Sequence, residues 1–265
     1  MAIDLFCGNF GFSAGWLEIG GYVVGFDLEH LPHHGPVPNG ADLVIQDVLT
    51  LHGKQFKDAA LIVASPPCTE FSWMAMPWSR AKQVARALCG EDEFPANYRG
   101  SRTVAQLTAL FDACFRIQRE AIEAAGHFIP MVVENVRGAQ PWVGRSRANY
   151  GSFHLWGDVP ALMPMTNAVQ KFNPDGTEHP PGSWFAIADS KKRGGMKGSV
   201  GTINGSGKLR EQSSWDRGQK VPGFRFDGSG SKARKAASAA IAKIPFPLAR
   251  HIAAYWKPVE HRMSA

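Results

Sequence analysis

The chain has 265 residues, enough to bury the core of one large domain or of one domain with a small lobe. Its hydrophobic content of 44% and charged content of 20% are ordinary for a globular protein and argue against a disordered chain. The net charge of +6 permits a polyanionic partner without requiring one.

Three further absences narrow the class of protein. No apolar run approaches the roughly 18 residues of a membrane span, and the amino terminus shows no signal peptide. The four cysteines (Cys7, Cys68, Cys89 and Cys114) have no C-x-x-C spacing, which argues against a zinc site. We therefore expect a cytoplasmic protein with reduced thiols, no metal and no membrane contact.

The basic character of the chain belongs to one segment. Residues 191–235 hold twelve Lys/Arg and three Asp/Glu, so the remainder of the chain is net acidic. A charge run is usually a solvated face, but this one also contains Trp215, Phe224 and Phe226 among ten glycines. That mixture favours a nucleic-acid surface.

In chain order, the sequence begins with a short apolar strand, a turn containing Gly8 and Gly11, and a helix. A strand, a glycine loop and a helix present backbone N–H groups to a nucleotide-like ligand in many α/β folds, although the loop alone is weak evidence. Residues 22–26 form a second predicted strand that ends at Asp27, and residues 42–46 form a third that ends at Asp47. Asp27 is equally typical of a ribose-binding acid or of a turn or helix cap.

The fourth predicted strand, Leu61 to Ser65, is stopped by Pro66 and Pro67, and Cys68 follows. Free cysteines are often core residues. A thiol directly after such a break instead lies where open α/β sheets bind their ligands, beyond the carboxyl ends of the strands. Local context alone leaves a core thiol and a nucleophile equally open for Cys68.

The second half of the chain is less regular. Residues 69–100 have no clear period and predict a long loop, and residues 101–125 predict a helix with Cys114 on its apolar stripe. Residues 129–133 predict a strand with Glu134-Asn135-Val136 at its end, and residues 141–230 are irregular. We expect a first domain over residues 1–150, a small basic lobe over 151–231, and a return to the first domain over 232–265.

Together these residues resemble the cytosine-5 DNA methyltransferase family. The resemblance covers roughly residues 1–160 and 236–256, and the motifs occur in the family's order. They are Asp4-Leu5-Phe6-Cys7-Gly8 with Gly11-Phe12, then Pro67-Cys68 with Phe71-Ser72, Glu134-Asn135-Val136, and Ile244-Pro245 with Leu248-Ala249. The resemblance implies an α/β, Rossmann-like S-adenosylmethionine-dependent methyltransferase domain with a small irregular target-recognition lobe.

The resemblance also implies roles for individual residues. Cys68 would be the nucleophile that adds to the cytosine ring, Glu134 would bind the same ring, and Asn135 would hold the loop that carries Cys68. S-adenosyl-L-methionine would be held by Phe6, Gly8, Asn9, Phe10, Gly11, Asp27, Leu28, Asp47, Val48 and Pro66. DNA would be contacted by Arg145, Arg147, Lys191, Lys192 and Arg193.

The sequence departs from the family's pattern in four places. Phe10 replaces the first glycine of a pair, and Ala242-Lys243 replaces a Gly-Asn pair. After Asn149-Tyr150-Gly151 the family has Gln-x-Arg-x-Arg, whereas this chain has His154, Trp156 and Asp158. Arg145 and Arg147 lie just upstream and could take the place of the missing arginines of that motif. The lobe is also short, which suggests few base contacts and a short or degenerate target.

Several alternatives stay open at this point. An exocyclic-amine methyltransferase would place an aromatic residue after Pro-Pro, where this chain has Cys68. An enzyme acting on RNA or on free pyrimidine nucleotides, and a catalytically silent DNA-binding paralogue, would each keep the same motifs. We expect a monomer acting on double-stranded DNA, of restriction-modification, phage or prophage type, and the target sequence is open.

Overall fold

The computed structural model describes residues 1–31, 34–68, 71–72, 78–90, 104–164 and 243–257. Met1–Thr166 and Lys243–Ala265 group into one unit of the chain, and Asn167–Ala242 into another. All of the described residues belong to the first unit. Lys191, Lys192, Arg193 and most of the predicted lobe lie outside the described residues.

A seven-stranded sheet with the order β3-β2-β1-β4-β5-β7-β6 forms the centre of this unit. Five strands run parallel, and they bring the carboxyl ends predicted from the sequence to one edge. These strands are β1 (Ala2–Leu5), β2 (Val23–Asp27), β3 (Ala41–Ile45), β4 (Leu61–Ala64) and β5 (Met131–Asn135). Every residue of β1, β4 and β5 is buried, as expected for strands covered on both faces.

Two further strands complete the sheet. β7 (Phe153–Gly157) runs antiparallel between β5 and β6 (Ala148–Tyr150), so β6 again points along β5. We expected the small lobe to begin at residue 151, but β7 pairs with β5 and belongs to the sheet. The alternation of Phe153, Leu155 and Gly157 with His154 and Trp156 did not predict this strand, because both of its faces are partly apolar.

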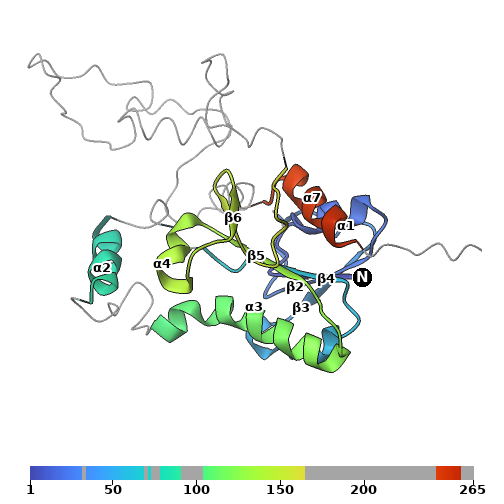
Figure 1. Ribbon diagram of the computed structural model, residues 1–265, viewed down its shortest axis with the longest axis horizontal. Coiled ribbons are helices and arrows are strands. Elements are labelled where there is room, and N and C mark those ends of the chain that lie inside the picture. The colour runs from blue at the N-terminus through green and yellow to red at the C-terminus, as the bar shows by residue number, and fades with distance from the viewer. Residues whose placement is uncertain (32–33, 69–70, 73–77, 91–103, 165–242, 258–265) are drawn as a thin grey trace, which may run out of the picture. The chain divides into compact units, whose positions relative to one another are not determined.

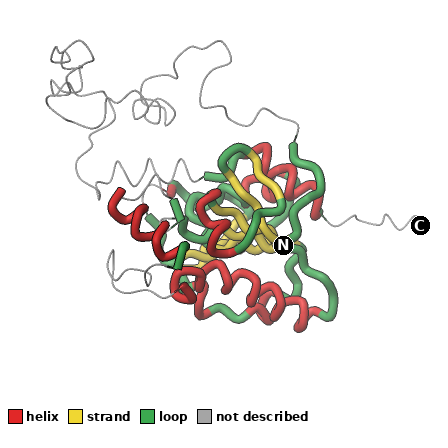
Figure 2. Tube along the Cα trace, turned by 60° about the vertical axis from the view of Figure 1, so that its left-hand side comes forward, coloured by secondary structure: helices red, strands yellow, loops and turns green. Residues whose placement is uncertain are grey.

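Helices cover both faces of the sheet (Figures 1 and 2). The helices α1 (Ser13–Glu18) and α7 (Phe246–Trp256) lie side by side on one face of the sheet. They approach closely at Gly15, where a Cβ atom would stand 2.2 Å from the carbonyl carbon of Ala249. The predicted helix α3 (Val104–Ala125) covers the other face through its stripe of Phe111, Cys114 and Ile117.

Shorter elements complete the unit. The helix α2 (Trp78–Leu88) lies where we predicted only a loop, and it buries Ala81 and Val84, three residues apart on one side. The short helix α4 (Gln140–Val143) precedes β6. Two 3₁₀ turns, Val48–Thr50 and Gly53–Phe56, connect β3 to β4.

The strand order is that of a doubly wound nucleotide-binding sheet with one antiparallel strand inserted beside its edge. This is the α/β, Rossmann-like architecture that the sequence predicted. In such a sheet ligands bind beyond the carboxyl ends of the strands, where the order reverses between β1 and β4. The fold therefore directs attention to the residues that follow β1, β2, β4 and β5.

Candidate active site at the carboxyl edge of the sheet

Cys68 lies at this edge, in the loop that follows β4. Its thiol is half-buried, whereas Cys7 and Cys114 are buried in the core and Cys89 is exposed. The backbone turns sharply after it, because the N–H groups of Phe71 and Ser72 both donate to the Cys68 carbonyl, at 3.0 and 2.9 Å. The Pro-Pro break thus leaves Cys68 at the rim of the sheet and outside the core cluster.

Asn135 connects the Cys68 loop to the neighbouring strand. It ends β5, is only 1% exposed, and donates from Nδ2 to the Pro66 carbonyl oxygen at 2.9 Å. Its own Oδ1 accepts the N–H of Val136 at 2.8 Å. The bond to Pro66 is buried, so the Asn135 side chain fixes the path of the loop two residues before Cys68.

Glu134 lies inside β5, whereas the sequence placed it after the strand's end. The pairing of β5 with β7 extends the strand, and Glu134 stands opposite Leu155 in the ladder. Glu134 is 9% exposed, and this burial raises the pKa of its carboxyl to about 8, with the Ser65 hydroxyl acting in the opposite direction. At neutral pH the Glu134 carboxyl is therefore mostly protonated and able to donate a hydrogen bond.

The thiol of Cys68 is influenced by the same environment. Burial, and then the neighbouring Glu134 carboxyl, raise the pKa of Cys68 to about 11. Both causes disfavour the thiolate, and the second weakens whenever Glu134 holds its proton. At neutral pH the site therefore holds a protonated thiol beside a protonated acid.

Asp27 links the ends of β1 and β2. Its Oδ2 accepts the N–H of Gly8 at 2.8 Å, and its Oδ1 accepts the N–H of Leu28 at 2.7 Å. Leu28 is 68% exposed, which is unusual for a leucine beside a buried sheet. The carboxylate thus fixes the glycine loop, retains unused lone pairs, and has an exposed apolar side chain next to it.

The glycine loop has an unusual backbone. Phe6, Gly8 and Phe10 have φ angles of +61°, +48° and +56°, in the left-handed region. For a residue other than glycine this conformation costs on the order of 1–2 kcal/mol. Phe10 offsets the cost by burying its ring, 2% exposed, against Gly25, where a Cβ atom would stand 2.6 Å from the ring. Phe10 thus adopts a glycine-like backbone in place of the family's glycine.

The glycine loop also contacts the carboxyl-terminal segment on one side and the buried Asp4 on the other. Gly11 approaches the final segment so closely that a Cβ atom would stand 2.7 Å from the backbone nitrogen of Ile244. Beneath the loop, Asp4 is buried and accepts a hydrogen bond from Ser13 Oγ at 2.5 Å. Burial raises the pKa of Asp4 to about 7. Asn9, between Gly8 and Phe10, is half-buried.

Asp47 and Val48 follow β3 at the same edge. Asp47 caps the first 3₁₀ turn, because its Oδ1 accepts the N–H of Leu49 at 2.9 Å, and Val48 is buried in the core. Asp47 is nevertheless exposed. The Gln46 N–H bonds the Asp27 carbonyl at 2.8 Å, so the ends of β2 and β3 meet here.

Arg145 and Arg147 are exposed on the loop between α4 and β6. Ser146, between them, donates from its backbone N–H to Gln140 Oε1 at 3.3 Å, and its Oγ lies 2.9 Å from His154 Nδ1. His154 stands opposite Asn135 in the ladder, so this loop is tied to the same edge as Cys68. No pattern in the sequence predicts the hydrogen bond between Ser146 and His154, because only the pairing of β6 with β7 brings these two side chains together.

Trp156 and Asp158, at the positions of the family's arginines, have structural roles. Trp156 is 5% exposed, packs edge-on against Phe111 with ring centres 5.3 Å apart, and donates from Nε1 to the Gly144 carbonyl. Asp158 Oδ2 accepts the N–H of Met131 at 2.9 Å and the Gln118 amide at 2.6 Å. Neither position supplies a positive charge to the site.

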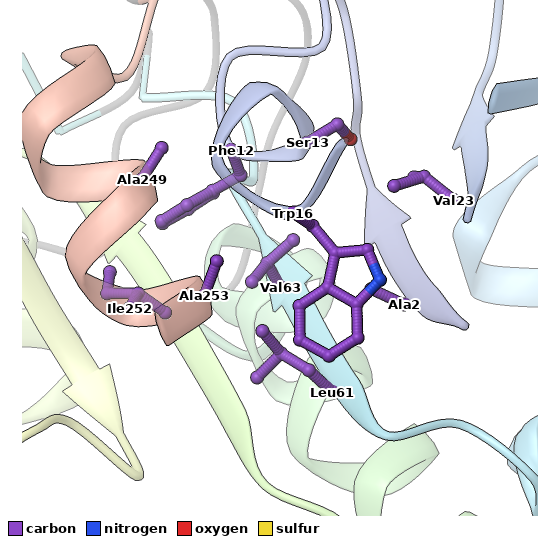
Figure 3. A pocket seen from close by; sticks show the side chains of 10 residues that line it. All are labelled: Ala2, Phe12, Ser13, Trp16, Val23, Leu61, Val63, Ala249, Ile252 and Ala253. Atoms are coloured by element: carbon purple, nitrogen blue, oxygen red, sulfur yellow. The ribbon is translucent and has the colours of Figure 1, made fainter. Parts of the chain in front are cut away.

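A small apolar cavity lies elsewhere, under α1 and α7 at the amino ends of the strands (Figure 3). Ala2, Val23 and Leu61 form its floor, and Trp16 and Ile252 reach over it from the two helices. Its lining residues are almost all apolar, and it lies at the opposite end of the strands from Cys68. We interpret it as imperfect packing between the helices and the sheet.

The described residues show neither a metal site nor a membrane-spanning helix. They contain no cluster of three or more His, Cys, Asp or Glu side chains placed to hold a metal ion. Among the same residues, no helix is long and apolar enough to cross a membrane.

Comparisons with known proteins return distant structural likenesses only. No protein-family profile and no curated protein matches the chain. One similar structure is a protein described as a putative DNA modification methyltransferase encoded within an E. coli prophage, with 19% identity over 52% of this chain and 32% of that one, at a TM-score of 0.30. Another is Spodoptera frugiperda DNMT2, with 15% identity over 54% of this chain and 39% of that one, at a TM-score of 0.29. This chain therefore matches less than half the length of either protein.

Proposed function

We propose that this protein is a DNA (cytosine-5) methyltransferase that acts through a covalent bond between Cys68 and a flipped-out cytosine. One observation carries the proposal. The half-buried Cys68 thiol follows β4, its loop is tied by Pro66 to Asn135, and the protonated Glu134 precedes that asparagine in β5. A nucleophile, a proton donor and a residue that holds the nucleophile's loop are what addition to a pyrimidine requires.

The residues after β1, β2 and β3 fit an S-adenosylmethionine cofactor. Asp27 retains lone pairs for ribose hydroxyls, and the exposed side chain of Leu28 offers an apolar surface to a purine. The left-handed glycine loop brings backbone close to such a ligand, and Asp47 and Val48 border the same edge. When bound, the cofactor would supply an electrophilic methyl group on a sulfonium.

In the proposed reaction the Cys68 thiolate adds to carbon 6 of cytosine, and the electron pair of the 5,6 double bond moves to carbon 5. Glu134 donates its proton toward ring nitrogen 3 and so stabilises the negative charge that the addition creates. Carbon 5 would take the methyl group as the sulfur–methyl bond of the cofactor breaks, so that the sulfonium leaves as a neutral thioether, and nitrogen 3 would return its proton to Glu134. Loss of the carbon-5 proton to a base then returns an electron pair to the ring, and the carbon–sulfur bond breaks to release the thiolate.

The Cys68 thiol must lose its proton before it can add. Its pKa of about 11 leaves roughly one molecule in ten thousand ionised at neutral pH. The protonated form of Glu134 removes one cause of that high pKa, because a neutral carboxyl does not repel the thiolate. Protonated Glu134 therefore has two effects. It does not repel the Cys68 thiolate, and it donates a proton to cytosine.

The charges favour a nucleic-acid substrate, and we propose duplex DNA. A base inside a duplex must leave the stack at a cost of a few kcal/mol before a thiol can reach it. Arg145 and Arg147 are exposed on the loop beside this edge and would contact phosphates. Lys191, Lys192 and Arg193, in the basic segment, would add to that attraction and make binding salt-dependent.

A silent DNA-binding paralogue is the second candidate, and two observations favour it. The thiol of Cys68 is poorly ionised, and the positions of the family's arginines hold Trp156 and Asp158. Such a protein would bind cofactor and DNA without turnover.

The test offers a labelled methyl donor together with duplex DNA, single-stranded DNA, RNA or dCTP. The wild-type protein, Cys68→Ala and the matched control Cys89→Ala, which removes an exposed thiol, are compared. We expect label on carbon 5 of cytosine in duplex DNA with the wild type and Cys89→Ala, and none with Cys68→Ala, which still binds the donor. Turnover in Cys68→Ala would eliminate the covalent route, and DNA binding without label in the wild type would establish the silent paralogue.

A further inference from the structure

Ser65 carries the side chain on which this inference depends. It follows β4, and its N–H continues the ladder by bonding the Leu5 carbonyl at 3.1 Å. Its Oγ atom is buried and has no hydrogen-bond partner. A buried hydroxyl without a partner destabilises the folded state, so its presence calls for an explanation.

The register of the sheet places Ser65 beside Glu134. Ala64 pairs with Val133 in the parallel β4–β5 ladder, so the next step sets Ser65 against Glu134. Side chains at the same level of neighbouring strands point to the same face. On its other flank Glu134 faces Leu155 of β7, which is fully buried and apolar. In this row of described residues, Ser65 is the polar neighbour of the acid.

Within the part of the chain that the structure describes, the pKa of Glu134 responds to burial and to the Ser65 hydroxyl and to no charged side chain. The Cys68 thiol, from the loop after β4, is the titratable group whose pKa responds to Glu134. Burial, and then Arg137, lower the pKa of His154, but His154 alternates with Leu155 along β7 and so points to the opposite face. The Ser65 hydroxyl lies close enough to lower the pKa of Glu134, although its Oγ atom makes no hydrogen bond of normal geometry.

We propose that Ser65 is a positioning residue for Glu134, a role that rests on the proposed function. Its O–H donates to the Glu134 carboxylate when the acid is ionised, and its oxygen accepts from the carboxyl O–H when the acid is protonated. A hydroxyl can do both by rotating, because it has one donor and two lone pairs. Ser65 thus holds the acid in one orientation while a proton leaves it and returns to it during the reaction.

The test follows Glu134 itself and does not need turnover. In protein labelled with ¹³C at glutamate carboxyls, the Glu134 signal is assigned by its absence from Glu134→Gln and then titrated with pH. In Ser65→Ala we expect the midpoint to move to higher pH by about half a unit or more, because the donor to the ionised form is lost. Ser65→Thr, which keeps the hydroxyl, should return the midpoint toward the wild type, and Ser152→Ala, at an exposed serine, should leave it unchanged.

Each outcome of the titration either supports or overturns the role proposed for Ser65. A Ser65→Ala midpoint equal to that of the wild type, or moved to lower pH, would overturn the proposal. A shift that Ser65→Thr fails to reverse would do the same, because packing and not the hydroxyl would then be responsible. If no variant transfers methyl groups while the titration behaves as expected, the proposed function fails and the link between Ser65 and Glu134 stands.

Discussion

Replacing Glu134 by glutamine tests the protonation state on which the proposed chemistry depends. The amide would keep the size and hydrogen-bonding capacity of the side chain but could not ionise. In the wild type, burial raises the Glu134 pKa from an ordinary 4.5 to about 8, so between these values the folded protein holds a proton that the unfolded chain has lost. The folded state binds more protons in that window, and its stability must therefore fall as pH rises.

The size of the effect follows from the same two values. Each pH unit between 4.5 and 8 corresponds to about 1.4 kcal/mol, so the complete effect is at most about 5 kcal/mol. Near pH 4 both proteins hold a neutral side chain and should be almost equally stable. By pH 9 Glu134→Gln should be the more stable protein by several kcal/mol, because it has no carboxylate to bury. Asp4, whose pKa is raised to about 7, contributes to both proteins and cancels in the difference.

The measurement is urea unfolding of wild type and Glu134→Gln at several pH values between 4 and 9. Glu123→Gln, which changes an exposed carboxyl on α3, is the matched control and should follow the wild type throughout. Parallel stability curves for wild type and Glu134→Gln would refute the reasoning, since the buried acid would then titrate as it does in the unfolded chain. In the methyl-transfer assay Glu134→Gln should lose about two to three orders of magnitude, because an amide cannot give up a proton to the base.

Two further predictions concern the supports of the site. Asn135→Ala should cost about 2 kcal/mol and speed alkylation of Cys68 by iodoacetamide, because the Pro66 carbonyl loses its donor. Asn135→Asp, which keeps the acceptor for the Val136 N–H but not the donor, should speed alkylation equally, and an unchanged rate in both would show that Asn135 does not hold the loop. Gly15→Ala should lower stability by about 3 kcal/mol or more, because its Cβ would stand 2.2 Å from the Ala249 backbone and force α1 and α7 apart. A melting temperature equal to that of the wild type would contradict that close approach.

Local patterns in the sequence were sufficient for most of the core strands. Apolar runs that end in Asp27 and in Pro66-Pro67-Cys68 mark β2 and β4, because burial on both faces demands apolar residues and proline stops a strand. The same holds for α3, whose apolar stripe recurs at three and four residues. The positions of Asp27 and Cys68 follow from chain continuity, since each lies at or just beyond the end of its strand.

Local sequence patterns did not predict the elements whose structure depends on contacts with distant parts of the chain. The strand β7 has no clean alternation that would predict it, yet its pairing with β5 extends that strand through Glu134 and buries the acid. The helix α2 lies in a segment without clear period, and only its contact with the core shows which side is apolar. The resemblance implies that Asp47 holds the cofactor, and the structure shows it capping a turn while it stays exposed.

The fold class and the residue types at the carboxyl edge could be inferred from the chain alone, because short-range periodicity and strand-ending residues act locally. What those residues do to one another depends on the assembled sheet. Asn135 reaches the Pro66 carbonyl across 69 positions of sequence, and Ser65 meets Glu134 through the register of β4 and β5. Hydrogen bonds and pKa values depend on distance and on burial, and no single segment of the chain encodes either of them.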